Sequence, residues 1–86
     1  LSETHYNLGL QYQKAGRRQQ AIDAFQDAIT VNMGNLDARY HLAGVFGEVG
    51  RLQDAASQLQ IIVRIDPGFE KAAEHLEGIR RALGGQ

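Results

Sequence analysis

Apolar residues recur along the chain at steps of three and four, the spacing that places side chains on one face of an α-helix. The clearest stretch has apolar residues at positions i, i+3, i+4 and i+7, namely Leu42, Val45, Phe46 and Val49. The pattern predicts an all-α chain of five helices, at residues 2–15, 18–31, about 36–49, 52–65 and 69–83. In the first helix, Leu8, Tyr12 and Ala15 form the predicted buried stripe, beside Gly9.

Glycine and short polar segments mark the ends of these helices. Gly16 and Gly50 follow the first and third stretches, and glycine readily adopts the left-handed conformation that ends many helices. Residues 32–35 and 66–68 are rich in Asn, Asp, Gly and Pro, which favour turns. Because the connections are so short, neighbouring helices are expected to lie antiparallel.

The sequence repeats itself with a fixed period. Identical residues recur at one constant spacing in the pairs Tyr6 and Tyr40, Leu8 and Leu42, Gly16 and Gly50, Arg17 and Arg51, Gln19 and Gln53, Ala21 and Ala55, Gln26 and Gln60, and Gly34 and Gly68. A fixed period of this length indicates stacked units that cannot bury their apolar faces alone. We interpret residues 1–86 as a single domain with a first repeat at 2–35, a second at 36–69 and a capping helix at 69–83.

The capping interpretation depends on charged residues in the last predicted helix. Glu77 and Arg80 stand where the two earlier repeats have a small and an aromatic residue. A charged pair is costly to bury, so no further helix is expected on that face. Residues 84–86 are expected to form a frayed end.

The third predicted helix contains two glycines in its interior, Gly44 and Gly47. Each costs about 1 kcal/mol relative to alanine in a helix interior. Tertiary packing must therefore hold this helix, or a close backbone approach must explain the glycines.

Charge and composition exclude several classes of function. Nine basic and ten acidic residues give a net charge of −1, so no basic surface for nucleic acid is predicted. The chain has no cysteine, and its longest aliphatic run in the C-terminal half, 61–63, is far shorter than the ~20 residues of a membrane-spanning helix. No catalytic triad or phosphate loop has supporting spacing. We predict no enzymatic activity, no cofactor and no membrane insertion; the compartment is unknown, and the start at Leu1 suggests a piece of a longer protein.

These positions resemble the tetratricopeptide repeat, a helix pair of about 34 residues with characteristic small and aromatic positions. The first repeat matches at Leu8, Gly9, Tyr12, Gly16, Ala21, Phe25 and Ala28, and departs at His5 and Met33. The second matches at Leu42, Ala43, Phe46, Gly50, Ala55 and Pro67, and departs at Arg39, Leu59 and Ile62. The resemblance implies a right-handed superhelix of antiparallel helices that serves as a protein–protein interaction scaffold.

The resemblance also implies that a peptide or helix of a partner protein binds in a concave groove lined by the first helix of each repeat. The candidate peptide-binding residues by repeat position are Glu3, Tyr6, Asn7, Leu10, Gln13, Asp37, Tyr40, His41, Lys71 and His75, with Lys14, Gly44, Gly47, Glu48 and Glu74 beside them. A known subclass grips a C-terminal carboxylate with lysine and asparagine. Tyr6 and Leu10 stand at those positions, so this clamp is not expected.

Several alternatives stay open from the sequence. Tyr6 and Tyr40 are either peptide anchors or structural filler between neighbouring helices. The rival function is assembly through an uncovered end, in which the module stacks on itself or on missing repeats of a larger multi-repeat protein. Its contact residues would be Leu1, Tyr6, Leu8 and Ile61. A third possibility is that the parent protein is an enzyme and this segment only positions its substrate.

Each group of histidines and arginines can be interpreted either as a binding site or as surface residues without a binding role. His41 and His75 lie one period apart, but neighbouring helices pack ~8–10 Å apart and zinc ligands converge at ~2 Å, so no metal is predicted. A histidine with an ordinary pKa of ~6.5 could instead modulate peptide binding. Three arginines follow the predicted first and third helices, Arg17, Arg18 and Arg51. We interpret them as solvated turn residues; the alternative is that they bind a phosphate group or an acidic partner.

Overall fold

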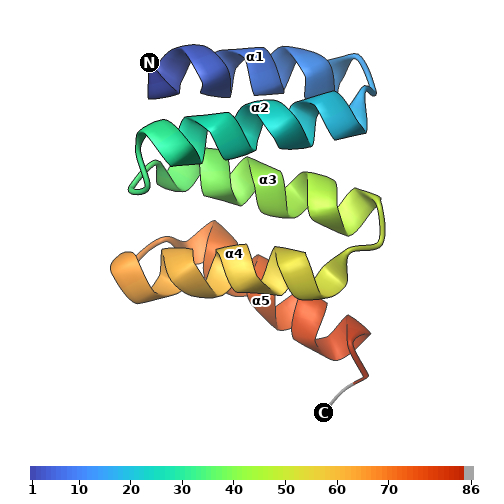
Figure 1. Cartoon of the computed structure of the whole chain (residues 1–86). Helices are drawn as coiled ribbons and strands as arrows, with labels where there is room; N and C mark the ends of the chain where they lie inside the picture. The colour runs from blue at the N-terminus through green and yellow to red at the C-terminus, as the bar shows by residue number, and fades with distance from the viewer. Residues whose placement is uncertain (85–86) are drawn as a thin grey trace.

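The computed structural model describes residues 1–84, which form five α-helices joined by short connections (Figure 1). The helices are α1 (Ser2–Lys14), α2 (Arg18–Val31), α3 (Leu36–Glu48), α4 (Leu52–Ile65) and α5 (Glu70–Ala82). The all-α prediction is confirmed, and each helix ends within one residue of its predicted bounds. Of the expected frayed end, residues 85 and 86 lie outside the part that the structure describes.

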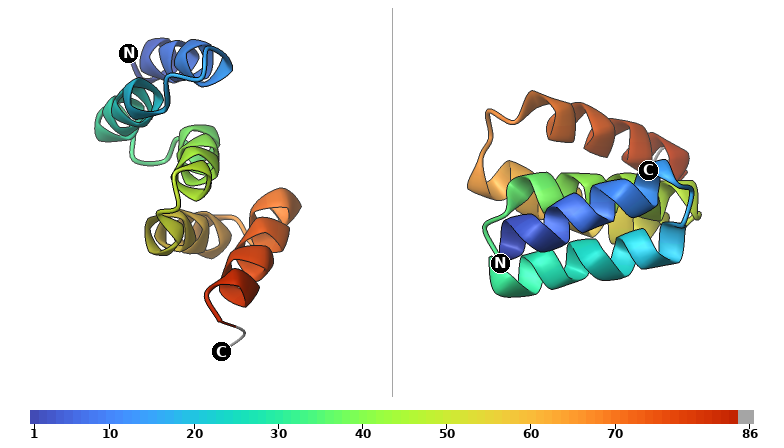
Figure 2. Two further views of the ribbon diagram at one scale, coloured as in Figure 1. Left: turned by 90° about the vertical axis from the view of Figure 1, so that its right-hand side faces the viewer. Right: turned by 90° about the horizontal axis from the view of Figure 1, so that it is seen from above.

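Consecutive helices run antiparallel, and each packs against the next along the chain. α1, α3 and α5 lie on one side of the stack, while α2 and α4 lie on the other (Figure 2). α1 also contacts α3 directly, which makes neighbours of two helices that are one repeat apart in sequence. The stack measures 37 × 26 × 17 Å.

The helix ends follow the glycine signals. Gly16 and Gly50 have φ angles of 74° and 82°, in the left-handed region that glycine adopts without strain. In both turns the chain then bonds back to the helix it has just left, since Arg17 N donates to Tyr12 O and Arg51 N donates to Phe46 O. The repeated glycines therefore serve the same turn in both helix pairs.

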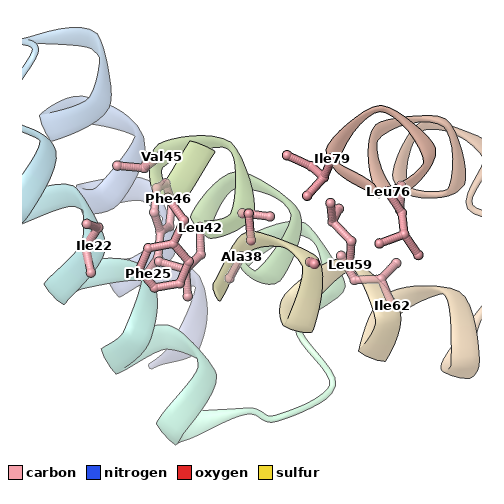
Figure 3. Packing of buried hydrophobic residues seen from close by; sticks show 14 of the residues in the cluster. Ile22, Phe25, Ala38, Leu42, Val45, Phe46, Leu59, Ile62, Leu76 and Ile79 are labelled. Carbon is pink, nitrogen blue, oxygen red and sulfur yellow. The ribbon is translucent and has the colours of Figure 1, made fainter. Parts of the chain in front are cut away.

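The core runs through the middle of the stack, between the two layers of helices (Figure 3). Its largest fully buried side chains are Phe25, Leu42, Val45, Leu59 and Ile62. Several alanines are also fully buried, including Ala21, Ala28, Ala43 and Ala55. The stripe predicted for α3 is confirmed at Leu42, Val45 and Phe46, which are buried, and is wrong at Val49, which is 42% exposed.

The predicted stripe of α1 is wrong in part. Leu8 is 44% exposed, although Leu42 at the same repeat position in α3 is only 1% exposed. Ala15 is exposed, Tyr12 is half-buried, and Gly9 is the one buried residue of the helix. The physical reason is coverage: α2 packs on α3, whereas no helix of residues 1–84 lies against the corresponding side of α1.

The close-approach explanation for Gly44 and Gly47 is also wrong. A Cβ atom placed at either glycine would meet no atom within 4 Å among the described residues. The α3 helix is instead held by its packing, because Ala38, Leu42, Val45 and Phe46 are all buried.

Arg39, a departure from the family pattern, is a buried structural residue. Its exposure is 7%, and burial lowers the pKa of its guanidinium. Nε donates a hydrogen bond to the backbone oxygen of Met33 at 2.9 Å, and Nη1 donates to Oε1 of Gln58 at 2.9 Å. Arg39 thus ties α3 to the turn before it and to α4.

The turns before α3 and α5 have the same geometry. Asn32 Oδ1 accepts from Gly34 N at 3.0 Å, and Asp66 Oδ1 accepts from Gly68 N at 3.0 Å. Met33 lies between Asn32 and Gly34 in the first turn, and Pro67 lies between Asp66 and Gly68 in the second.

Met33→Pro is therefore expected to stabilise the protein by about 0.4–1 kcal/mol, because proline reduces the entropy of the unfolded chain without straining this turn. Asn32 has the extended backbone (φ −143°, ψ 100°) that proline requires of the residue before it, and no backbone bond outside the helices uses Met33 N. Chemical denaturation gives the measurement. Pro67→Ala, the reverse change, should lose a similar amount; a destabilising Met33→Pro would show that the two turns differ.

Candidate functional site

Five aromatic rings follow one another across the side of the stack formed by α1, α3 and α5. We call this set the aromatic row; its members are Tyr6, Tyr40, His41, Phe69 and His75. All five rings are half-buried, and Phe25 of α2 lies beneath the row and is fully buried. Each of the five therefore presents part of its surface to solvent.

Ring contacts connect the row without a break. Tyr6 lies 6.0 Å from Phe25 and 5.7 Å from His41, measured between ring centroids. Tyr40 lies 5.7 Å from His41, 5.5 Å from Phe69 and 6.1 Å from His75. These separations are in the range where tilted and edge-to-face aromatic pairs are favourable. The row therefore joins α1, α3 and α5 into one surface.

The contacts decide part of the question about the two tyrosines. Tyr6 and Tyr40 pack against the core between neighbouring helices, as structural filler would. Each ring is also partly exposed, as a peptide anchor requires. The structure thus gives both residues a packing role, and their binding role stays a prediction.

Charged groups influence the ionisation of the row. Burial lowers the pKa of His41, Asp37 acts in the opposite direction, and Lys71, the weakest of the three influences, lowers it further. Burial and then Asp37 raise the pKa of Tyr6. Burial thus favours the neutral form of His41, whose pKa lies below the ordinary histidine value.

The other predicted groove residues surround the row. Glu3, Asn7, Asp37 and Lys71 are exposed, while Leu10 and Gln13 are half-buried. Leu10 packs against the core from α1. Phe69 is the one member of the row that the sequence did not single out, although its place directly after the Asp66-Pro67-Gly68 turn could have indicated a role.

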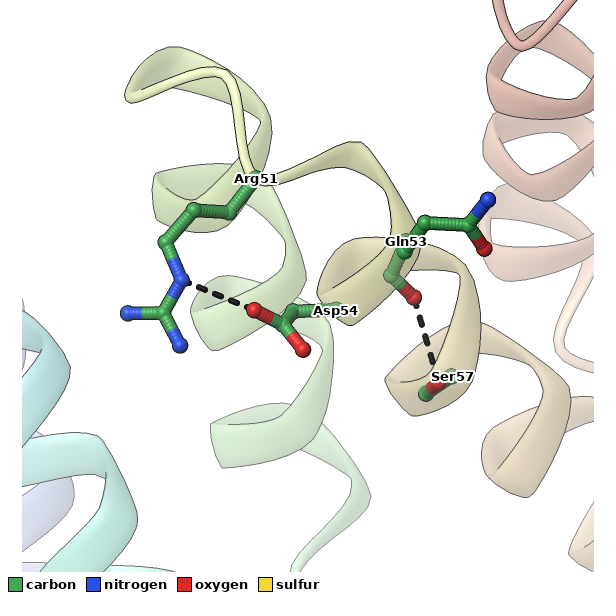
Figure 4. Close-up of polar contacts among 4 residues, drawn as sticks. All are labelled: Arg51, Gln53, Asp54 and Ser57. Carbon is green, nitrogen blue, oxygen red and sulfur yellow. Dashed lines mark hydrogen bonds and ion pairs between the residues drawn. The ribbon is translucent and has the colours of Figure 1, made fainter.

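Two of the three arginines near the turns have partners inside the fold. Arg51 pairs with Asp54 at 2.8 Å and lies 4.4 Å above the ring of Phe46. Figure 4 shows this pair beside the bond from Ser57 to the backbone of Gln53. Arg18 Nε lies 3.4 Å from Oε1 of Glu48, so it links α2 to the end of α3. These contacts favour the turn interpretation over a phosphate site.

Within residues 1–84 no group of three His, Cys, Asp or Glu side chains is placed to hold a metal ion. The same residues contain no helix with the length and hydropathy needed to cross a bilayer.

Residues 2–32 match the family model for the tetratricopeptide repeat. Two crystal structures of the protein MamA match the whole stack, with TM-scores of 0.93 and 0.92, each at 31% sequence identity and over 96% of this chain. Residues 2–32 thus form a tetratricopeptide repeat, and the whole stack has the fold of the MamA structures. The chain spans about half of those MamA chains, 48% and 45%. No curated protein sequence matches it.

The comparison confirms the fold class of this tetratricopeptide repeat chain, because the MamA structures share its helical stack at a TM-score of 0.93. The family match covers the first helix pair only. The second pair departs from the family pattern at Arg39 and Leu59, and both are buried in the structure. Tetratricopeptide repeats generally mediate protein–protein interaction and assembly.

Proposed function

We propose that this chain is a protein-interaction module that binds a short segment of a partner protein along the aromatic row. The row supports this proposal, since five partly exposed rings are fixed against a packed core. Aromatic side chains in such positions are typical binding anchors, because they add contact area at little cost in conformational entropy. The surface is thus organised before any partner arrives.

The charges around the row indicate the chemistry of the partner segment. The exposed carboxylates of Glu3, Asp37 and Glu74 come from α1, α3 and α5, the three helices that the row crosses. Lys71 is an exposed cation on α5 and is outnumbered by these carboxylates. We therefore expect a segment with apolar side chains for the rings and Lys or Arg beside them.

Selection of peptides from a random displayed library tests this proposal. Peptides selected by the unmodified chain should be enriched in Lys or Arg next to apolar residues. They should bind the double variant Tyr6→Ala with Tyr40→Ala at least about 10-fold more weakly, since buried aromatic anchors carry much of the binding free energy.

The matched control is Val49→Ala, which removes apolar surface at the opposite end of α3 and should leave affinity unchanged. Asp37→Lys with Glu74→Lys changes exposed charges only, and it should weaken the basic peptides while thermal unfolding stays the same. Selected peptides that bind all variants equally would reject the row as the site. A double tyrosine variant that no longer folds would make both tyrosines structural, and the charge variant would then decide.

Assembly into a larger structure is the second candidate function. The exposure of Leu1 (90%) and Leu8 (44%) on one end of the stack supports it. Tyr6 and Ile61, which were grouped with these residues in the self-association hypothesis, are both half-buried, and Tyr6 belongs to the aromatic row instead.

A further inference from the structure

His41 lies where the first helix pair meets α3 on the side of the aromatic row. Its ring centroid is 5.7 Å from Tyr6 of α1, 5.9 Å from Phe25 of α2 and 5.7 Å from Tyr40 beside it in α3. Phe25 is stacked on the imidazole with 27° between the two planes, whereas Tyr6 and Tyr40 meet it edge-on. Three rings thus enclose the imidazole, and its half-buried side chain still reaches solvent.

Two charged groups act on the ionisation of His41. Asp37, one helical turn earlier in α3, attracts an imidazolium, and Lys71 of α5 repels one. From the first helix pair, the neighbours are the phenol of Tyr6 and the uncharged ring of Phe25. Burial outweighs the attraction of Asp37, so the pKa of His41 lies below the ordinary histidine value of ~6.5. The packing therefore favours the neutral ring.

Asp37 connects His41 to the ligand proposed for the aromatic row. Its carboxylate is exposed, and its charge acts on both Tyr6 and His41, so it lies beside the junction of α1 and α3. A Lys or Arg of a bound segment that pairs with Asp37 therefore comes close to His41 as well. An imidazolium there would repel this cation and would compete with it for the same carboxylate. Protonation of His41 and binding of a basic segment thus oppose each other.

We propose that His41 is a pH-sensitive switch in the aromatic row: the neutral ring permits binding of a basic segment, and protonation of the ring releases it. This inference rests on the function proposed above, because it concerns release of the same ligand from the same row. The affinity is expected to fall as the pH falls below about 6.5, and to level off once His41 is protonated in both the free and the bound chain.

His75 provides a matched control, since it follows His41 by one repeat period and is also half-buried. Among the rings of residues 1–84, only Tyr40 lies against it, at 6.1 Å. The enclosure by three rings is thus particular to His41. In the first repeat the same position is occupied by Asn7. His41→Asn therefore introduces a side chain that the repeat already accepts there and that cannot be protonated.

A first experiment measures peptide affinity at about pH 7.5 and about pH 5, where ordinary Asp and Glu side chains stay mostly ionised. The probe is a capped peptide from the library selection that contains Lys or Arg but no Asp, Glu or His, so that it does not titrate itself. Its affinity for the unmodified chain should fall at least about 5-fold at the lower pH. His75→Asn should keep this ratio of affinities, and His41→Asn should lose it.

A second experiment needs no variant, and it decides the question if His41→Asn does not fold. An NMR titration follows the His41 ring in the unmodified chain with and without saturating peptide. Because linkage is reciprocal, a proton that weakens the peptide requires a peptide that weakens the proton. The peptide should therefore lower the pKa of His41 below its value in the free chain. A pKa that the peptide leaves unchanged or raises would overturn the switch.

The outcomes separate the switch from the proposed function. A peptide that binds Tyr6→Ala with Tyr40→Ala as tightly as the unmodified chain at about pH 7.5 would reject the aromatic row as the site, and the switch with it. A peptide that needs both tyrosines but keeps its pH dependence in His41→Asn would overturn the switch alone. Circular dichroism should show a folded chain at about pH 5, and unfolding there would also overturn the switch, because the lost affinity would then report the loss of the fold.

Discussion

Phe25→Ala is expected to cost about 3–5 kcal/mol of unfolding free energy, enough to unfold a large part of the protein at 37 °C. The ring is fully buried and lies at the centre of the first helix pair, 6.0 Å from Tyr6 and 5.9 Å from His41. Its removal leaves a cavity that α1 cannot fill, because Gly9 faces the ring. A stack of this size has a total stability of roughly 4–13 kcal/mol, so one such cavity takes a large share of it.

Urea denaturation followed by circular dichroism measures this loss. Met33→Ala is the control, since Met33 is 71% exposed and should change the midpoint very little. A loss below about 1 kcal/mol for Phe25→Ala would contradict the place of Phe25 in the core. The same substitution should also weaken binding along the aromatic row, because Phe25 supports Tyr6 and His41 from below.

Gly9→Ala should destabilise the protein by about 1–3 kcal/mol, although alanine is the better helix former. A Cβ atom at Gly9 would lie 2.6 Å from two carbons of the Phe25 ring, far inside van der Waals contact. The helix propensity gain is about 1 kcal/mol, and the ring is fully buried, so the overpacking dominates.

The second helix pair supplies the compensating change. Ala43 stands at the position of Gly9, and Leu59 stands at the position of Phe25, and both are fully buried. The double variant Gly9→Ala with Phe25→Leu should therefore lose less unfolding free energy than the two single variants lose in sum. We expect a difference of about 1 kcal/mol or more, which a double-mutant cycle measures.

Gly44→Ala is the matched control for the glycine substitution. A Cβ atom there meets nothing within 4 Å, so the same chemical change should stabilise α3 by up to about 1 kcal/mol. Equal effects at Gly9 and Gly44 would show that the contact with Phe25 has no influence on stability.

Local spacing predicted the helices well because each helix is defined by contacts three and four residues apart. The turns after α1 and α3 could also be predicted locally, because glycine at positions 16 and 50 permits the φ angles of 74° and 82° that the chain adopts there. Most partly exposed rings of the aromatic row could be named from the sequence because they recur in pairs one period apart, Tyr6 with Tyr40 and His41 with His75. Phe69 was missed, because its contact with Tyr40 is a tertiary one that no local spacing indicates.

The sequence by itself determined the helices, their ends, the repeat period and the family, all of which depend on residue types at fixed spacings. The tertiary structure decided which apolar positions are covered, because coverage depends on a helix from elsewhere in the chain. Leu8 and Leu42 are the same residue at the same repeat position, yet one is exposed and the other buried. Arg39 is buried for a similar reason, since its partner Gln58 comes from the next helix.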